Sequence, residues 1–205
     1  MSKRKKATGP GIPRALRTAD QGEPTLLIGN TSQYNWVWND SGSGANDDVT
    51  VWRPSPTDST FSIIGDYAQG NYSDPTGTSL TLKAINDNPS APLLAAPVGW
   101  RQVWNDKGSG GDHDGSIWSP VPPDGYVALG HVANSGYDAP NISNFVCVRR
   151  DLVETTQVGA IIWADHGSGA NSDLTLYSIQ GVQSAFVGQA NYNPFSGTVY
   201  KIKGT

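Results

Sequence analysis

The chain alternates between short apolar runs and stretches rich in Gly, Pro, Asn and Asp. In Val49-Thr-Val-Trp52 every second residue is aliphatic, so the two valines face one side of a strand while Thr50 and Trp52 face the other. The run at 174–177 repeats this alternation, whereas Gly115 occupies the first apolar position of the run at 115–118. Further short apolar runs lie at 61–64, 80–85, 126–129, 145–148 and 199–202. Such runs, bounded by turn residues, predict many β-strands and almost no helix.

One fifteen-residue pattern occurs three times without a gap, at 38–52, 104–118 and 163–177. Each copy begins with Trp, contains Gly-Ser-Gly and ends with Trp or Tyr, and the copies are offset by 66 and 59 residues. Five of the seven tryptophans occupy only two positions of this pattern, which chance does not explain. The chain is therefore an internal three-fold repeat.

Each repeat reads as a strand, a Gly-rich loop, a strand, a turn, a strand, a second turn and a last strand. A four-stranded sheet with one apolar face is not stable alone, but three such sheets can bury their faces around a pseudo-three-fold axis. We therefore predict an all-β fold, a three-fold pseudosymmetric β-prism of three four-stranded sheets, with a β-trefoil or a β-sandwich as alternatives. Residues 1–24 are predicted to form a flexible basic tail, and residues 25–205 a single domain with repeats at about 25–98, 99–156 and 157–205.

Charge is unevenly distributed along the chain. Residues 1–20 hold six of the 14 basic and one of the 18 acidic residues, which leaves 8 basic and 17 acidic residues and a formal charge of −9 in the remainder. A body this acidic is a poor match for nucleic-acid phosphates or anionic lipid headgroups. The chain has one cysteine, no apolar h-region behind its basic start, and no apolar stretch near the roughly 18 residues of a membrane span. These features predict a cytoplasmic or non-classically secreted protein without an internal disulfide.

The repeated Gly-rich loop is the candidate site. Its first and ninth residues are Asp in every copy, and two glycines flank the central serine; the set is Asp40, Gly42, Gly44, Asp48, Asp106, Gly108, Gly110, Asp114, Asp165, Gly167, Gly169 and Asp173. One interpretation is purely structural: the glycines allow positive φ and the first Asp caps backbone N–H groups. The other is ligand binding, since eight of the 17 acidic residues of the body lie in these loops and crowded carboxylates need a cation or hydroxyl donors.

Two ligand classes suit such loops. A hard cation such as Ca²⁺ takes carboxylate and carbonyl oxygens, and the six loop aspartates are its candidate ligands. A sugar donates its hydroxyls to Asp and stacks on exposed aromatic rings. No His, Cys or Ser occurs with an acid/base partner at a position shared by the repeats, so no catalytic residue is predicted and we do not expect an enzyme.

The second repeat carries a resemblance to a known family. Trp104-Asn-Asp-Lys-Gly-Ser-Gly110, the segment Ser116–Gly130 and the segment Val146–Val153 resemble the Vps62 (DUF946) family, and the likeness extends over about 32–203. It departs at Ser119, which stands where the first copy has Arg53, and in the third copy, which lacks the Pro-rich turn. The resemblance implies a β-prism-like domain linked to vacuolar sorting and found beside membrane-active modules, and it supplies no catalytic residues.

Together these observations predict a non-enzymatic binding module that recognises glycans in a lectin-like manner through its three Asp/Gly loops, with Ca²⁺ as a candidate cofactor. The alternative is a membrane-surface, lipid-targeting or toxin-associated module of the vacuolar-sorting-related family. A glycan or glycoconjugate is the expected partner and nucleic acid is not; the oligomeric state is left open.

Overall fold

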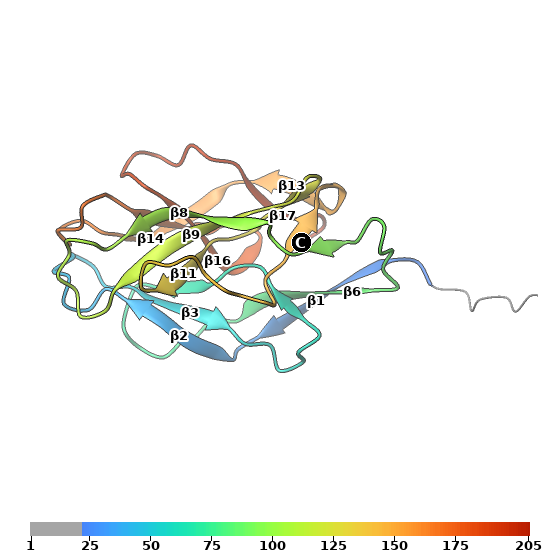
Figure 1. The fold of residues 1–205 in the computed structure, drawn as a ribbon, viewed down its shortest axis with the longest axis horizontal. Helices are drawn as coiled ribbons and strands as arrows, with labels where there is room; N and C mark the ends of the chain where they lie inside the picture. The colour runs from blue at the N-terminus through green and yellow to red at the C-terminus, as the bar shows by residue number, and fades with distance from the viewer. Residues whose placement is uncertain (1–21) are drawn as a thin grey trace, which may run out of the picture.

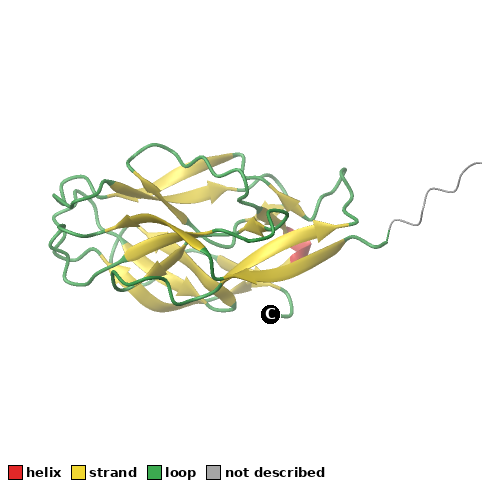
Figure 2. Cartoon of the chain, turned by 90° about the horizontal axis from the view of Figure 1, so that it is seen from below, coloured by secondary structure: helices red, strands yellow, loops and turns green. Residues whose placement is uncertain are grey.

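The structure is a computed structural model that describes residues 22–205. The predicted basic tail therefore lies outside the described residues except for residues 22–24, which precede the first strand. The chain folds into an elongated β-prism whose strands run mostly along its long axis (Figure 1). Almost all of the regular structure is strand, and one 3₁₀ turn, η1 (Arg150–Leu152), is the helical element of the described part (Figure 2).

Each repeat contributes a three-stranded antiparallel sheet next to its Gly-rich loop. These sheets consist of β2 (Tyr34–Asn39), β3 (Thr50–Pro54) and β5 (Tyr67–Gln69); β8 (Gly99–Asn105), β9 (Gly115–Val121) and β11 (Val132–Ser135); and β14 (Val158–Ala164), β15 (Thr175–Ile179) and β16 (Val182–Gln189). In each of them the Gly-rich loop joins the first two strands as a hairpin.

A second sheet of each repeat lies toward the opposite end of the molecule. These sheets consist of β1 (Thr25–Thr31), β6 (Ser79–Ile85) and β4 (Ser62–Ile63); β7 (Leu94–Ala95), β12 (Cys147–Arg149) and β10 (Tyr126–Val127); and β13 (Val153–Thr156) with β17 (Val199–Ile202). The β-prism prediction is confirmed. The strands expected in each repeat are present, but hydrogen bonding divides each repeat between these two sheets.

The strand pairing also shifts the predicted repeat boundaries. β7 pairs with β12 of the second repeat, and β13 pairs with β17 of the third. Both strands therefore belong to the repeat that follows them, although divisions at 98/99 and 156/157 assign them to the preceding one. Both strands are short, at two and four residues, so they do not show the alternation that marks the longer strands.

The first tryptophan of each repeat forms the core on the pseudo-three-fold axis. Trp38, Trp104 and Trp163 are each no more than 2% exposed, and their rings meet pairwise edge to face with centroids 5.8–6.0 Å apart. Aliphatic side chains from the inward faces of the strands pack around them: Val49, Val51, Ile117, Leu174 and Leu176. The burial of both valines agrees with the alternation at 49–52, which places them on one face of the strand.

Each of these indoles also ties its repeat to a neighbouring one. The Nε1 atoms of Trp38, Trp104 and Trp163 donate to the backbone carbonyls of His113, Ser172 and Asp47, over distances of 3.0, 2.7 and 2.7 Å. The three acceptors occupy the same loop position in the three repeats. The core is thus closed by a ring of equivalent hydrogen bonds, and every buried indole N–H of this cluster has a partner.

Gly115 departs from the repeat pattern for a steric reason. A Cβ atom at this position would lie 2.2 Å from Cδ1 and Nε1 of Trp38, well inside any permitted contact. The equivalent positions carry Val49 and Leu174. The second copy has no side chain here because the indole of the first copy occupies that space.

A second apolar cluster fills the opposite end of the prism and includes Leu82, Leu129, Val148, Val199 and Ile202. Cys147 is free and buried beside Phe145 in a third cluster, and burial raises the pKa of its thiol to about 12. This agrees with its interpretation as a small buried apolar residue. Among residues 22–205, no helix has the length and apolar character needed to cross a membrane.

Candidate ligand-binding loops

The three Gly-rich loops gather at one end of the prism, opposite the end from which β1 emerges (Figures 1 and 2). In the first loop the Ser43 N–H donates to the Asp40 carbonyl at 3.0 Å, and the Ser43 hydroxyl accepts from the Ala45 N–H at 3.2 Å. Gly42 and Gly44 have φ values of 78° and 77°, which a side chain would strain. The glycines of the other two loops have the same conformation, so Gly-Ser-Gly sets one rigid turn in all three copies.

The first Asp of each loop is a structural residue. Asp40, Asp106 and Asp165 are buried, and a carboxylate oxygen of each accepts the backbone N–H nine residues later, at 2.8, 3.0 and 2.8 Å. These hydrogen bonds close the base of each loop. Burial raises the pKa of Asp40 and of Asp106, and it outweighs the hydrogen bonds that favour their ionised forms.

The loops are joined to one another by backbone hydrogen bonds. The N–H groups of Asn46, Asp112 and Asn171 donate to carbonyls of a neighbouring loop, and the N···O distances are 2.7–2.8 Å. The acceptors are the carbonyls of His166, Ser41 and Lys107, again at one shared loop position. The three tips therefore converge into a closed ring.

A tyrosine from the turn after the third strand of each repeat reaches into each loop. The hydroxyls of Tyr72 and Tyr192 donate to Asp40 and Asp165 at 3.0 and 2.7 Å. Desolvation first, and then the neighbouring aspartates, raise the pKa of each of these tyrosines, so the hydroxyls remain donors at neutral pH. The sequence contained the signal for these residues, since a Tyr recurs in that turn in all three repeats, but no site role was assigned to it.

The second repeat differs. Tyr137 donates to the ninth residue, Asp114, at 2.9 Å rather than to the buried first one. The Oδ1 atom of Asp106 is buried and has no hydrogen-bond partner within residues 22–205. A buried carboxylate oxygen without a partner is costly and calls for a water molecule, a cation or another donor.

The ninth Asp of each loop is exposed, and so are the six loop glycines. Asp48, Asp114 and Asp173 therefore present carboxylates to solvent around the ring. Tyr72 and Tyr192 are 46% and 39% exposed at the same end. Of the predicted site, the structure brings all twelve residues to one end, buries the first aspartates and leaves the ninth ones accessible.

Nearby rings add further aromatic surface. Trp36 is 42% exposed and meets the His113 ring edge to face, with centroids 5.1 Å apart. The His166 ring lies against Tyr192 with centroids 3.7 Å apart, and the Lys107 ammonium lies over Tyr137 at 4.6 Å. Tyr137 and Tyr192 thus have different neighbours, which makes the three sites similar but not identical.

The proposed cation ligands lie in pairs rather than in larger sets. Within residues 22–205, no three His, Cys, Asp or Glu side chains gather closely enough to hold a metal ion. Each loop supplies two of the six candidate ligands, and the first of each pair is already engaged by the backbone. Because Ca²⁺ takes six to eight oxygens, carbonyls and water would have to complete its shell here. The Ca²⁺ hypothesis remains a prediction.

Comparison with known families agrees with this architecture. The family model described as "Vacuolar protein sorting-associated protein 62" (Vps62) matches residues 15–199. The chain belongs to the Vps62 family. Among solved structures, this Vps62 chain is similar to GNIP1Aa from Chromobacterium piscinae, with 34% identity and a TM-score of 0.77 over 87% of the present chain. The match covers 37% of the GNIP1Aa chain, so the present chain spans little more than a third of that protein. No curated protein matches this Vps62 chain.

Proposed function

We propose that the protein is a non-enzymatic binding module that recognises glycans in a lectin-like manner at the loop end of the prism. The observation that supports this most directly is the hydrogen-bonded ring of loops, which holds three exposed carboxylates, those of Asp48, Asp114 and Asp173, beside partly exposed tyrosines. A rigid base with three related sites suits a ligand that repeats the same chemical group.

The chemistry of the sites fits sugars. An ionised carboxylate accepts hydrogen bonds from vicinal hydroxyls, and the neighbouring tyrosine ring offers an apolar face for the C–H side of a pyranose. A hydrogen bond to a charged acceptor contributes about 1.5–3 kcal/mol. Weak single sites of this kind gain affinity when one branched glycan, or a surface dense in glycans, engages two or three of them.

A glycan array probed with the folded protein, with and without Ca²⁺, tests the proposal. We expect binding to a restricted set of glycans, and a triple variant (Asp48→Asn, Asp114→Asn, Asp173→Asn) to bind at least about tenfold more weakly, because each site loses its charged acceptor. Dependence on Ca²⁺ would assign the cation to the paired aspartates, and equal binding in a chelator would remove Ca²⁺ from the proposal.

The matched control removes the same number of charges elsewhere. Glu23, Asp124 and Glu154 are exposed and lie outside the loops, so Glu23→Gln, Asp124→Asn, Glu154→Gln should leave glycan binding unchanged. A blank array with folded protein in both conditions contradicts the proposal. Flotation with anionic vesicles in place of glycan binding would support the membrane-surface alternative instead.

The structural relative GNIP1Aa is much longer than the present chain. The present fold corresponds to 37% of the GNIP1Aa chain, which is therefore longer than one prism. We propose that the prism supplies recognition and that any further activity resides in other domains or partner chains. A pull-down with the glycan-bound protein, compared with the triple aspartate variant, would test for such partners.

A further inference from the structure

Two positions of the repeat line the junctions between neighbouring repeats and differ among the three copies. The first position follows the strand aromatic at Trp52, Trp118 or Tyr177, and is occupied by Arg53, Ser119 and Ser178. In the neighbouring strand, that aromatic pairs with Tyr67, Val132 or Val187. The second position is the residue just before this partner, and it is occupied by Asp66, His131 and Phe186. The internal symmetry therefore allows the three junctions to be compared directly.

The junction between the first and second repeats is filled by an ion pair. Asp66 is completely buried, and Arg53 donates to both of its oxygens through Nε and Nη2 at 3.1 and 3.0 Å. The Ala133 N–H of the second repeat also donates to Asp66 at 2.9 Å, and Arg53 donates in return to the Ala133 carbonyl. Every charge at this junction is paired, and the guanidinium occupies the space between the two sheets.

The junction between the second and third repeats lacks this pair. His131 takes the place of the acid, and its Nδ1 accepts the N–H of Gly188 at 3.1 Å, as Asp66 accepts that of Ala133. Ser119 takes the place of Arg53 and lines a hollow of about 360 Å³. The cation is instead Arg101, which pairs with Ser119 across β8 and β9.

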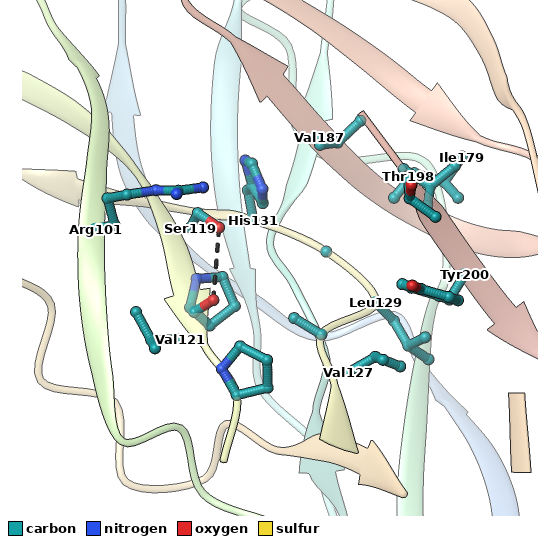
Figure 3. Close-up of a pocket in the computed structure, with 15 residues that line it drawn as sticks. Arg101, Ser119, Val121, Val127, Leu129, His131, Ile179, Val187, Thr198 and Tyr200 are labelled. Atoms are coloured by element: carbon teal, nitrogen blue, oxygen red, sulfur yellow. Dashed lines mark hydrogen bonds between the residues drawn. The ribbon is translucent and has the colours of Figure 1, made fainter. Parts of the chain in front are cut away.

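Arg101 extends over Ser119 toward His131 (Figure 3). Within residues 22–205 its guanidinium makes no ion pair and donates no hydrogen bond to the protein, although it lies beside a hollow of about 360 Å³. A second hollow of about 480 Å³ is also lined by Arg101, Ser119 and His131, so the two hollows adjoin at these residues. No acidic side chain lines either hollow.

The walls of the 360 Å³ hollow combine polar and apolar side chains. Ser119 lies beside Arg101, whereas Thr198 lies across the hollow near Ile179 (Figure 3). Most of the lining is apolar, and its aliphatic part includes Val127, Leu129, Ile179, Val187 and Val199. Burial lowers the pKa of His131 to about 3, and Arg101 adds to this effect. The imidazole is therefore neutral at physiological pH, and Arg101 is the one charged side chain of the hollow.

The third junction provides an internal contrast. It also has serine at the first position, Ser178, and a hollow of about 570 Å³, but Phe186 replaces the histidine and no charged side chain lines the space. An open volume alone is thus common to two junctions. Only the second junction combines it with an unpaired guanidinium.

We propose that the junction between the second and third repeats is a binding site for a small organic anion, whose carboxylate or phosphate group pairs with Arg101 while its apolar body lies against the aliphatic wall. The site is separate from the loops and does not depend on the function proposed for them. The anion would supply, from outside the chain, the acid that Asp66 supplies at the first junction. Arginine binds either oxyanion in the same bidentate geometry, so both groups satisfy this chemistry.

Backbone NMR titration with three probes of similar size tests the proposal: phenylacetate, phenyl phosphate and the uncharged 2-phenylethanol. We expect saturable shifts centred on the amides of His131 and Gly188 with at least one anion, with a dissociation constant of ~1 mM or lower, as suits a ligand of about ten heavy atoms. 2-Phenylethanol should bind at least about tenfold more weakly, because it makes no charge-assisted hydrogen bond. The two anions distinguish a carboxylate site from a phosphate site.

Two variants with controls complete the test. Arg101→Gln should weaken anion binding about tenfold, whereas Arg149→Gln, which removes a partly exposed cation outside the hollow, should not change it. The double variant Ser119→Arg, His131→Asp rebuilds the ion pair of the first junction in the second, and it should fold and lose binding because its own guanidinium fills the hollow. Equal affinity for 2-phenylethanol, absence of shifts with both anions, or undiminished binding by the folded double variant would overturn the proposal.

Discussion

The indole Nε1 of Trp163 donates to the backbone carbonyl of Asp47, 116 residues earlier in the chain, over 2.7 Å. With the equivalent bonds from Trp38 and Trp104, it closes a ring that joins the core to all three loops. The loop end is consequently held by these three partly buried hydrogen bonds as well as by the bonds between the loop backbones. Core and loops should therefore unfold together.

Trp163→Phe tests this coupling. The variant keeps an aromatic ring but removes the N–H and leaves both a small cavity and the Asp47 carbonyl without its partner. We expect a loss of about 2–4 kcal/mol in the free energy of unfolding, measured by denaturant titration. Trp36→Phe, at an exposed position of β2, should lower the free energy of unfolding by less than about 0.5 kcal/mol. A loss confined to the loops, with a normal global transition, would contradict the coupling.

Gly115 is predicted to be intolerant of any side chain. Gly115→Ala places Cβ 2.2 Å from the Trp38 indole, and its backbone is part of β9, so the ring or the strand must move. We expect a loss of about 1–3 kcal/mol by overpacking, and a larger one for Gly115→Val, although valine is the residue of the first repeat. Gly99→Ala, where a Cβ would contact nothing within 4 Å, is the control and should be nearly neutral.

The ion pair of the first junction predicts a strongly non-additive pair of substitutions. Arg53→Ser leaves Asp66 buried without its counter-ion and should cost about 3–5 kcal/mol. Burial already raises the pKa of Asp66, so the cost should shrink as the pH falls and the carboxyl is protonated in the folded state. Adding Asp66→His recreates the second junction and should recover much of the loss. Additive losses in a double-mutant cycle would show that the repeats are not equivalent here.

The sequence predicted the features that all three copies share, and it failed where they differ. The tryptophan core and the meeting of the loops follow from a repeat that cannot bury its apolar face alone. For Asp40 the sequence left two interpretations open, a structural cap and a ligand-binding residue. The sequence alone does not show which loop carboxylate accepts backbone N–H groups. Arg53, Asp66 and His131 were missed because each also bonds to the backbone of the next repeat. Their partners, such as Ala133 and Gly188, are fixed only by the packing of one sheet on the next.

His131 gives a pH prediction with a defined sign. Its pKa is about 3 in the folded protein and 6.5 in the unfolded chain, so between these values the unfolded chain binds the extra proton. This contribution to stability is complete above pH 6.5 and is lost as the pH falls toward 3, by up to about 1.4 kcal/mol per pH unit. Because His131 lines an open hollow, the change in stability per pH unit should be smaller than this upper limit. His131→Asn retains an acceptor for the Gly188 N–H but does not titrate. The wild type should therefore lose more stability than the variant as the pH falls. Parallel stability curves from pH 7 to 4, measured by urea unfolding, would show that the imidazole is protonated in the folded state and that the hollow admits a second cation beside Arg101.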